Sequence, residues 1–168
     1  MRAVLGTVLA LMLSIGISGL AAAQGAQVAF GGFQQDTTLP VEITADQLQI
    51  DQADGSATFS GNVSIGQGDM RLTAQKVRVE YASGEGDSTG RISILYATGG
   101  VTLVNGAEAA EAREATYTID TGLIVLSGDV VLTQGRNALS ANRLVVDLTK
   151  GTGTMEGRVK TILQTDGN

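Results

Sequence analysis

The stretch ATFSGNVSIGQGDMRLTAQKVRVEY, residues 57–81, decides the fold because it holds the two sequence units from which the chain is built. The first unit is centred on Gly61 and the second on Ala74, thirteen residues later, and in both of them apolar and polar residues alternate. This alternation is typical of β-strands. The units recur at the glycines Gly61, Gly99, Gly128 and Gly157 and at the alanines Ala45, Ala74, Ala112 and Ala141.

The spacing of the units is regular. Successive alanines lie 29, 38 and 29 residues apart, and the extra residues of the long step fit a polar loop at 82–90. A fixed period of this size is typical of folds in which one supersecondary unit is repeated. The sequence therefore predicts a stack of repeats of about 29 residues, which would form a long continuous surface rather than a compact catalytic pocket.

Each alanine is followed by a shift in the alternation. Leu72 and Ala74 share one face, but the next apolar residues, Val77, Val79 and Tyr81, have the other parity. The same shift follows the other three alanines. An extra residue at a constant place is what a β-bulge or a strand corner produces. We therefore expect an all-β fold in which two antiparallel sheets meet at a fold line and enclose apolar side chains.

The composition limits the chemistry that the chain can perform. It has 23 glycines and one proline, and it has no histidine, cysteine or tryptophan. The commonest general base, thiol nucleophile and soft metal ligands are therefore missing, and we expect no cofactor or metal. The groupings of Glu108, Glu111 and Glu114 and of Asp51 and Asp54 are interpreted as a solvated strand face and an Asx turn. A net charge of −6 argues against nucleic-acid binding, which needs clustered Lys and Arg.

The first residues have the pattern of an export signal. Arg2 provides a positive start, residues 3–20 are almost wholly apolar, and three alanines precede Gln24. This pattern predicts a cleavable signal peptide with cleavage after Ala23, and the alternative is an uncleaved membrane anchor. The predicted organisation is a signal peptide at 1–23, a flexible lead-in at 24–38, a single domain at 39–165 and a tail at 166–168.

Three segments resemble one known family. Residues 40–51 (PVEITADQLQID), residues 57–81, and residues 125–163 (VLSGDVVLTQGRNALSANRLVVDLTKGTGTMEGRVKTIL) are similar to the LptA/OstA family of lipopolysaccharide-transport proteins. The resemblance implies a β-jellyroll folded into a V, a β-taco, in the periplasm of a Gram-negative bacterium. It implies a bridge that carries lipopolysaccharide from the inner to the outer membrane without enzymatic activity. The implied partners are an LptC-type inner-membrane protein, an LptD-type outer-membrane protein and further copies of the chain joined head to tail.

Such a carrier needs an apolar trough. Exposure of an acyl chain of about twelve carbons to water costs roughly 9 kcal/mol, at about 0.8 kcal/mol per CH₂. A folded sheet with an apolar inside would cover the acyl chain along its whole length. The predicted lipid-binding residues are the inward positions of the strands, namely Leu48, Ile50, Phe59, Val63, Ile65, Val77, Val79, Tyr81, Val101, Leu103, Tyr117, Ile119, Leu126, Val130, Leu132, Leu144 and Val146.

Two further features concern partners. Unpaired strands near residues 40–50 and 155–163 would allow end-to-end pairing with another chain. Lys76, Arg113 and Arg143 occupy similar places in their repeats, and would either meet an anionic headgroup or protect the surface against aggregation. Three alternatives remain open, which are an LptC-like membrane-anchored component, a β-scaffold without a ligand, and a β-helix enzyme that depends on carboxylates.

Overall fold

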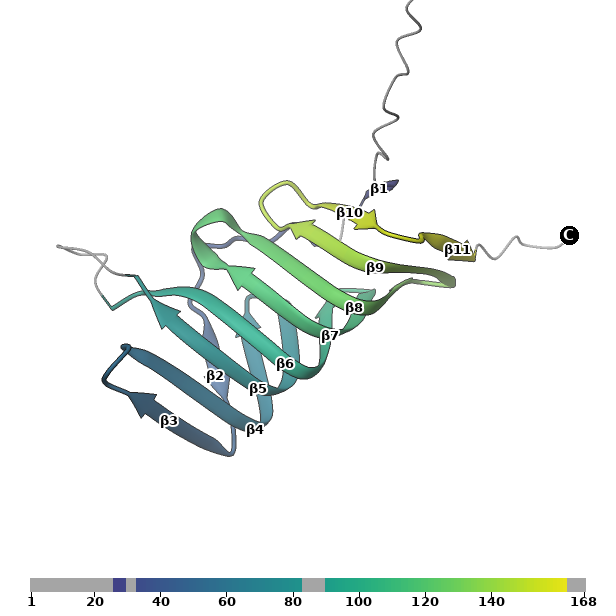
Figure 1. Ribbon diagram of the computed structural model, residues 1–168. Coiled ribbons are helices and arrows are strands. Elements are labelled where there is room, and N and C mark those ends of the chain that lie inside the picture. Colours follow the sequence, from purple (N-terminus) through teal and green to yellow (C-terminus); the bar gives the residue numbers. More distant parts are fainter. Residues whose placement is uncertain (1–25, 30–32, 83–89, 163–168) are drawn as a thin grey trace, which may run out of the picture.

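The chain forms a row of antiparallel strands (Figure 1). A computed structural model describes residues 26–29, 33–82 and 90–162, so the predicted signal peptide, the centre of the polar loop and the tail lie outside the described residues. The elements are β1 (Ala26–Ala29), β2 (Glu42–Thr44), β3 (Gln47–Asp51), β4 (Ser56–Gln67), β5 (Met70–Tyr81), β6 (Ile92–Asn105), β7 (Glu108–Thr118), the 3-10 helix η1 (Ile119–Thr121), β8 (Leu123–Gln134), β9 (Asn137–Asp147), β10 (Thr152–Glu156) and β11 (Lys160–Ile162).

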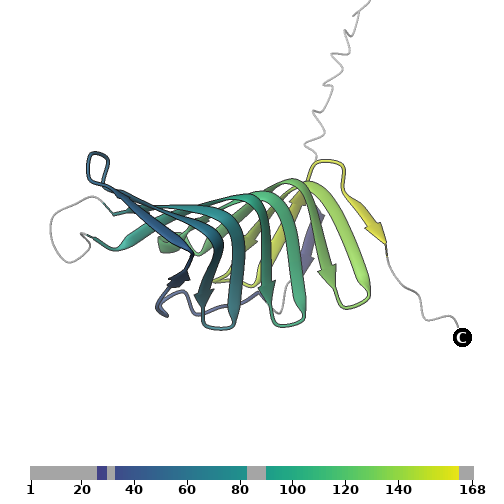
Figure 2. The same ribbon diagram turned by 90° about the horizontal axis from the view of Figure 1, so that it is seen from below.

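The strands are ordered β1-β10-β9-β8-β7-β6-β5-β4-β2, and the two ends of this row do not meet, so the sheet is open. At each end one long strand carries two short partners, because β4 pairs with both β2 and β3, and β9 pairs with both β10 and β11. The long strands therefore belong to two half-sheets at once, and each long strand bends between them (Figure 2). An open all-β antiparallel architecture is the fold that the sequence predicts.

We name the half-sheets by their short strands. The β3 half-sheet contains β3, β10, β1 and residues 56–60, 76–81, 92–98, 114–118, 123–127 and 143–147. The β2 half-sheet contains β2, β11 and residues 63–67, 70–74, 101–105, 108–112, 130–134 and 137–141.

A line of β-bulges separates the two half-sheets. The ladder between β4 and β5 shifts register between Ser60 and Val63. The two residues inside this shift, Gly61 and Asn62, have φ angles of 78° and 46°. The shift predicted after each alanine is thus a real corner in the backbone. The same pair of positive φ angles recurs at Gly99 and Gly100, at Gly128 and Asp129, and at Gly157 and Arg158.

The fold line requires glycine because the neighbouring strand passes too close for a side chain. A Cβ at Gly128 would lie 2.9 Å from the Cβ of Arg113, and a Cβ at Gly61 would lie 2.5 Å from Oδ2 of Asp46. Arg113 and Asp46 each directly follow a repeat alanine. The backbone N–H of Asp46 also donates a 2.9 Å hydrogen bond to the carbonyl oxygen of Gly61. The glycine unit of one strand and the alanine unit of its neighbour therefore meet at the fold line and form one corner together.

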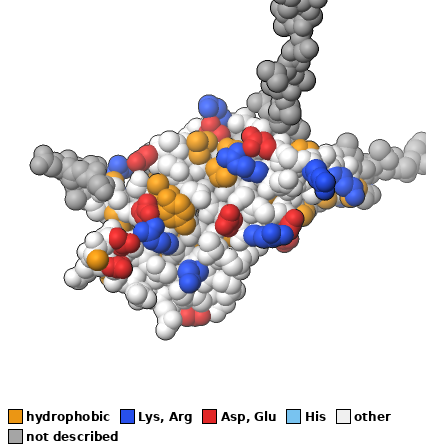
Figure 3. Space-filling view, viewed as in Figure 1, with side chains coloured by type: hydrophobic (Ala, Val, Ile, Leu, Met, Phe, Trp, Pro, Cys, Tyr) orange, Lys and Arg blue, Asp and Glu red, His pale blue; other side chains and the backbone are white. Residues whose placement is uncertain are grey.

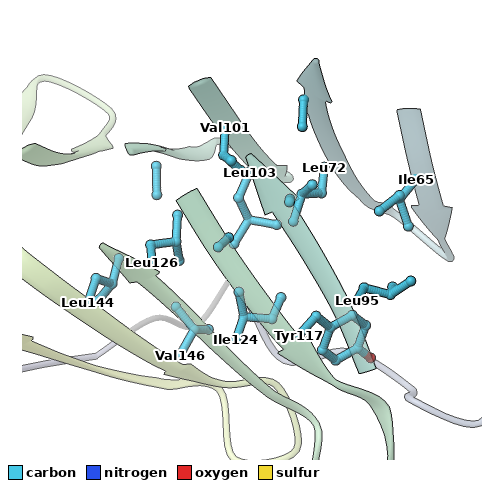
Figure 4. Close-up of a cluster of buried hydrophobic side chains, with 14 of the residues drawn as sticks. Ile65, Leu72, Leu95, Val101, Leu103, Tyr117, Ile124, Leu126, Leu144 and Val146 are labelled. Carbon is cyan, nitrogen blue, oxygen red and sulfur yellow. The ribbon is translucent and has the colours of Figure 1, made fainter. Parts of the chain in front are cut away.

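The hydrophobic core lies inside the V. Leu72 and Leu103 from the β2 half-sheet come together there with Tyr117 and Ile124 from the β3 half-sheet (Figure 4). None of these four side chains is more than 2% exposed. Burial of each such side chain contributes about 1.5–3 kcal/mol, so the apolar interior is the main force that holds the half-sheets together.

A segment without regular structure, residues 33–40, crosses the open side of the V, and we call it the strap (Figure 2). The side chain of Phe33 is fully buried, and the backbone N–H of Gln35 donates to the carbonyl oxygen of Leu148 at 2.9 Å. Further along, the Nε2 of Gln67 donates to the carbonyl oxygen of Thr37 at 3.0 Å. Most of the strap falls in the predicted lead-in at 24–38, which thus contains the strand β1 and a buried aromatic side chain.

Candidate functional site

The inner surface of the V is the candidate site, because both half-sheets present apolar side chains to it. The predicted lipid-binding residues differ in how accessible they are. The buried ones are Val63, Ile65, Val77, Val79, Val101, Leu103, Tyr117, Leu126, Val130, Leu132, Leu144 and Val146, Phe59 and Ile119 are partly buried, and Leu48, Ile50 and Tyr81 are exposed.

No further strand covers the apolar interior at the end of the row that carries β2 and β3, and we call this the unfinished end. Leu48 and Ile50 pair with Phe59 and Ala57, so they lie on the inner side of β3. They are nevertheless 54% and 66% exposed, because β3 is the last strand of its half-sheet. A shallow pocket lined by Ile43, Leu48 and Phe59, among others, lies between β2 and β3. This end of the V therefore offers apolar surface that nothing in the described part of the chain covers.

A larger cavity of about 520 Å³ opens beside the strap. On one side it is lined by strap residues 37–40, Val41 and Gln67. On the other side it is lined by Arg91, Ile92, Ile119 and Asp120. The walls of this cavity therefore come from the strap and from both half-sheets.

The opposite end of the V is closed. Leu144, Val146, Leu148 and Met155 are all fully buried. The strand β1 pairs with β10 from Ala26↔Met155 to Ala29↔Thr152, so the chain's own N-terminal strand covers the edge of the β3 half-sheet there. The interior therefore changes along the row from open, at β2 and β3, to filled, at β9 and β10.

A buried hydrogen-bond network joins the two half-sheets. The hydroxyl of Tyr117 donates to Oε1 of Gln67 at 2.6 Å. Burial raises the pKa of Tyr117 to about 12, against the opposing effect of the hydrogen bond from its hydroxyl to Gln67. The phenol is therefore neutral at physiological pH, and it remains a donor to Gln67.

Polar residues occupy the last inward positions beside the hairpin turns of the β2 half-sheet. Gln67 ends β4, Asn105 ends β6 and Gln134 ends β8, while Glu108 begins β7 and Asn137 begins β9. We call this row the polar lip. Sequence reasoning missed it, although the signal was present, since in these five strands a polar residue takes the inward place next to the turn, beyond the apolar residues.

The three predicted basic residues lie on the outside of the V. Lys76 is in register with Ser60 and Thr98 on the outer face of the β3 half-sheet. Arg113 pairs with Asp129 at the fold line, and Nη1 of Arg143 lies 2.6 Å from Oε2 of Glu156. Figure 3 shows basic and acidic side chains interspersed over this outer face. The three basic side chains therefore do not face the apolar interior of the V.

The carboxylates of the turns have structural partners. Oδ1 of Asp54 accepts from the backbone N–H and the hydroxyl of Ser56 at 3.0 and 2.7 Å, and Oδ1 of Asp51 accepts from the N–H of Ala53 at 2.9 Å. The hydroxyl of Ser56, followed by the guanidinium of Arg78, lowers the pKa of Asp54. Over the described ranges, no three acidic side chains are grouped so that they could hold a metal ion.

The described residues contain no helix that is both long and apolar enough to cross a membrane. Membrane spanning by a helix needs about 20 mainly apolar residues. The single helical element described, η1, has three residues.

Comparisons with known proteins agree with this geometry. No curated protein matches the chain. A crystal structure of LptH, described as the LptA homologous periplasmic component of the conserved lipopolysaccharide transport device from Pseudomonas aeruginosa, matches with a TM-score of 0.66. The match has 17% sequence identity and covers 78% of this chain and 99% of LptH, so it shows the fold. The family described as LptA/(LptD N-terminal domain) LPS transport protein matches residues 42–152. The chain therefore belongs to this family of lipopolysaccharide-transport proteins, which are not enzymes.

Proposed function

We propose that this protein is a periplasmic bridge that shields the acyl chains of lipopolysaccharide inside the V and carries them from the inner to the outer membrane. The observation that supports this most is the apolar interior that runs along the row and is left uncovered at the β2 and β3 end, where Leu48 and Ile50 are exposed. Membership of a lipopolysaccharide-transport family gives the class of cargo.

The energy of acyl burial favours this use of the interior. An acyl chain gains about 0.8 kcal/mol for each CH₂ that leaves water. The inner rows offer many similar apolar positions, and none of the fully buried residues in the described part of the chain carries a charged side chain. A surface of this kind holds an acyl chain at many places with similar energy, which suits movement along the row.

Cargo would first contact the unfinished end. The trough there is formed by Val41 and Ile43 before and on β2, by Leu48 and Ile50 on β3, and by Phe59 on β4. Deeper residues such as Leu144 are fully buried against their own neighbours. An acyl chain that moves deeper must therefore replace contacts between the two half-sheets, and the half-sheets part as it does so.

The ends of the row would join to partners. At one end β2 and β3 expose their outer edges, and at the other end β11 and the added strand β1 are the last strands. Strand addition at such edges supplies the missing ladder hydrogen bonds. The proposed partners are an LptC-type inner-membrane protein, an LptD-type outer-membrane protein and further copies of the chain. Export would depend on the predicted signal peptide.

Photo-crosslinking tests the proposed cargo and the proposed face together. A photoreactive residue at Ile50 or Val79, on the inner side, should capture lipopolysaccharide in cells. The matched control positions are the adjacent residues Gln49 and Arg78, which have the opposite orientation and should capture little. Equal capture at both sets would contradict the inner site. Absence of capture at every position, with no saturable binding of a fluorescent fatty acid, would favour a β-scaffold without a ligand.

The LptC-like alternative differs in its N-terminus. A membrane-anchored component would keep residues 1–23, whereas a soluble bridge would begin at Gln24 after cleavage. N-terminal sequencing of the exported protein separates the two. A mature chain that still begins at Met1 would contradict the soluble bridge while leaving the apolar interior available for cargo.

A further inference from the structure

Two neighbouring side chains of the polar lip each hold one buried atom without a hydrogen-bond partner. Asn105 and Glu108 face each other across the ladder of β6 and β7, next to the turn that joins these strands. Asn105 is only 3% exposed, and its Nδ2 is buried without a partner. Oε1 of Glu108 accepts a hydrogen bond from Nε2 of Gln134 at 2.9 Å, but its Oε2 is buried without a partner.

Such atoms are unusual in a folded protein. The large majority of buried side-chain polar atoms have a partner, and each exception calls for an explanation. Here the two exceptions are cross-strand neighbours, one a donor and the other an acceptor, on the inner side of the V.

We propose that Asn105 and Glu108 together bind a hydroxyl group of the headgroup of the amphiphilic cargo, an inference that rests on the proposed function. A hydroxyl oxygen accepts from the Nδ2 of Asn105 while its proton is donated to Oε2 of Glu108. Both unpartnered atoms are then satisfied by one group. A phosphate fits less well, because at neutral pH it is mostly dianionic, so it rarely offers a proton to Glu108 and its negative charge repels the carboxylate.

The place in the fold agrees with an amphiphile. The next inward residues on the same two strands are Leu103 and Ala110, and both are fully buried in the core. The lip is therefore the boundary between the apolar interior and the open side of the V. A cargo whose acyl chains lie against Leu103 would present its hydroxylated headgroup to Asn105 and Glu108.

Two amphiphiles with the same acyl length test the site. We would titrate the mature chain by calorimetry with dodecyl maltoside, a sugar headgroup with hydroxyls, and with lauryl dimethylamine oxide, whose oxide oxygen only accepts. The wild-type chain should bind the maltoside about tenfold more tightly, which is the effect of about one hydrogen bond to a charged group. The double variant Asn105→Leu, Glu108→Leu should lose this preference through weaker maltoside binding.

The controls separate a role in binding from a role in folding. The variant Glu111→Leu changes an exposed glutamate on the outer face of the same strand and should keep the preference. The double variant should be at least as stable as wild type, because it removes buried polar atoms that have no partner. If it does not fold, Glu108→Gln keeps the shape and should weaken maltoside binding alone.

The outcomes distinguish this site from the proposed function. If wild type binds neither amphiphile, the apolar interior does not take acyl chains and the proposed function is contradicted. If both bind, but the double variant keeps the wild-type preference or wild type has none, the hydroxyl site alone is overturned. If the double variant bound both amphiphiles equally more weakly than wild type, the hydroxyl site would also be overturned. Asn105 and Glu108 would then stabilise the interior and would not recognise the headgroup.

Discussion

Tyr117 and Gln67 meet inside the V, where the tyrosine hydroxyl donates a 2.6 Å hydrogen bond to Oε1 of the glutamine. Tyr117 lies on the β3 half-sheet and Gln67 on the β2 half-sheet. The Nε2 of the same glutamine donates to the carbonyl oxygens of Thr37 and Leu39 at 3.0 and 2.9 Å. One side chain therefore ties both half-sheets and the strap together across the open side.

Removal of the tyrosine hydroxyl should destabilise the fold measurably. The variant Tyr117→Phe leaves Oε1 of Gln67 buried without its donor, which costs about 1–2 kcal/mol. The variant Gln67→Leu also releases two strap carbonyls, and we expect a larger loss of about 3 kcal/mol. Urea unfolding of the chain from Gln24 onward measures both changes in the free energy of unfolding.

The matched control is Tyr96→Phe. The hydroxyl of Tyr96 lies 3.5 Å from Oε2 of Glu80 on the outer face, which is a long and partly exposed contact. Its removal should change the free energy of unfolding by less than about 0.5 kcal/mol. A loss in Tyr117→Phe no greater than this would mean that the buried hydrogen bond does not hold the half-sheets together.

The fold line should tolerate no side chain in place of its glycines. Gly128 has φ of 83°, and a Cβ there would lie 2.9 Å from the Cβ of Arg113. The variant Gly128→Ala combines this clash with backbone strain, and we expect it to lower the free energy of unfolding by about 3 kcal/mol. Gly106→Ala is the control, because Gly106 has φ of 59° in a turn and no atom within 4 Å of the added Cβ. It should cost about 1 kcal/mol.

If the two alanine variants were equally stable, the close approach of Arg113 would not contribute to the loss in free energy of unfolding. The corner would then be set by the positive φ angles alone. The outcome therefore separates the two reasons for which glycine is needed at the fold line, and urea unfolding measures both variants under the same conditions.

The fold could be predicted because its main signals are local. The shift in alternation after Ala74 locates the corner, although the extra residue of the bulge lies in the strand beside it, at Gly61 and Asn62. The strap could not be predicted, because residues 33–40 have no period. Their place depends on contacts with distant residues, such as the hydrogen bond of Gln67 to Thr37.

The candidate site was predicted only in part. Leu48 and Val146 have the same alternation in the sequence, yet Leu48 is exposed and Val146 is fully buried. The difference arises because β3 ends its half-sheet, while β10 and β1 continue the sheet beyond β9. Glu108 was grouped with Glu111 in the sequence. Strand pairing separates them, since Glu108 belongs to the inner lip and Glu111 to the outer face.

Asp147 should make stability depend on pH at the β9–β10 turn. The ammonium of Lys150 and the hydroxyl of Thr149 lower the pKa of Asp147 from 3.8 to about 2. Because the pKa is lower in the folded state, the stabilisation is complete above about pH 4 and is lost as the pH falls through about 2. The variant Asp147→Asn should therefore be less stable than wild type at pH 7, by about 1–2 kcal/mol, and this difference should shrink in acid.

Urea unfolding of both proteins between pH 7 and pH 2 measures this dependence. Asp69→Asn, at an exposed turn residue, is the control and should differ little from wild type at either pH. A constant difference between Asp147→Asn and wild type over the whole range would mean that the carboxylate charge has no part in the turn. The loss would then be due to shape alone.

Head-to-tail association should depend on the unfinished end of the V. Leu48 and Ile50 lie on the inner side of the last strand, and burial of this apolar surface by a second copy would favour a junction. The double variant Leu48→Glu, Ile50→Glu should weaken self-association at least tenfold, because two carboxylates would be buried without partners. Sedimentation velocity over a range of protein concentrations measures the association.

The matched control places the same charges on the outer face. Val104 and Val131 are 37% and 39% exposed, so Val104→Glu, Val131→Glu should leave both folding and association unchanged. Equal weakening by the two double variants would show that charge, and not the inner end of β3, governs association. A wild-type chain that stays monomeric at every concentration would contradict head-to-tail assembly of copies. In that case the apolar end would be free to meet a different partner, and loss of pull-down of an LptC-type or LptD-type protein by Leu48→Glu, Ile50→Glu would locate that junction.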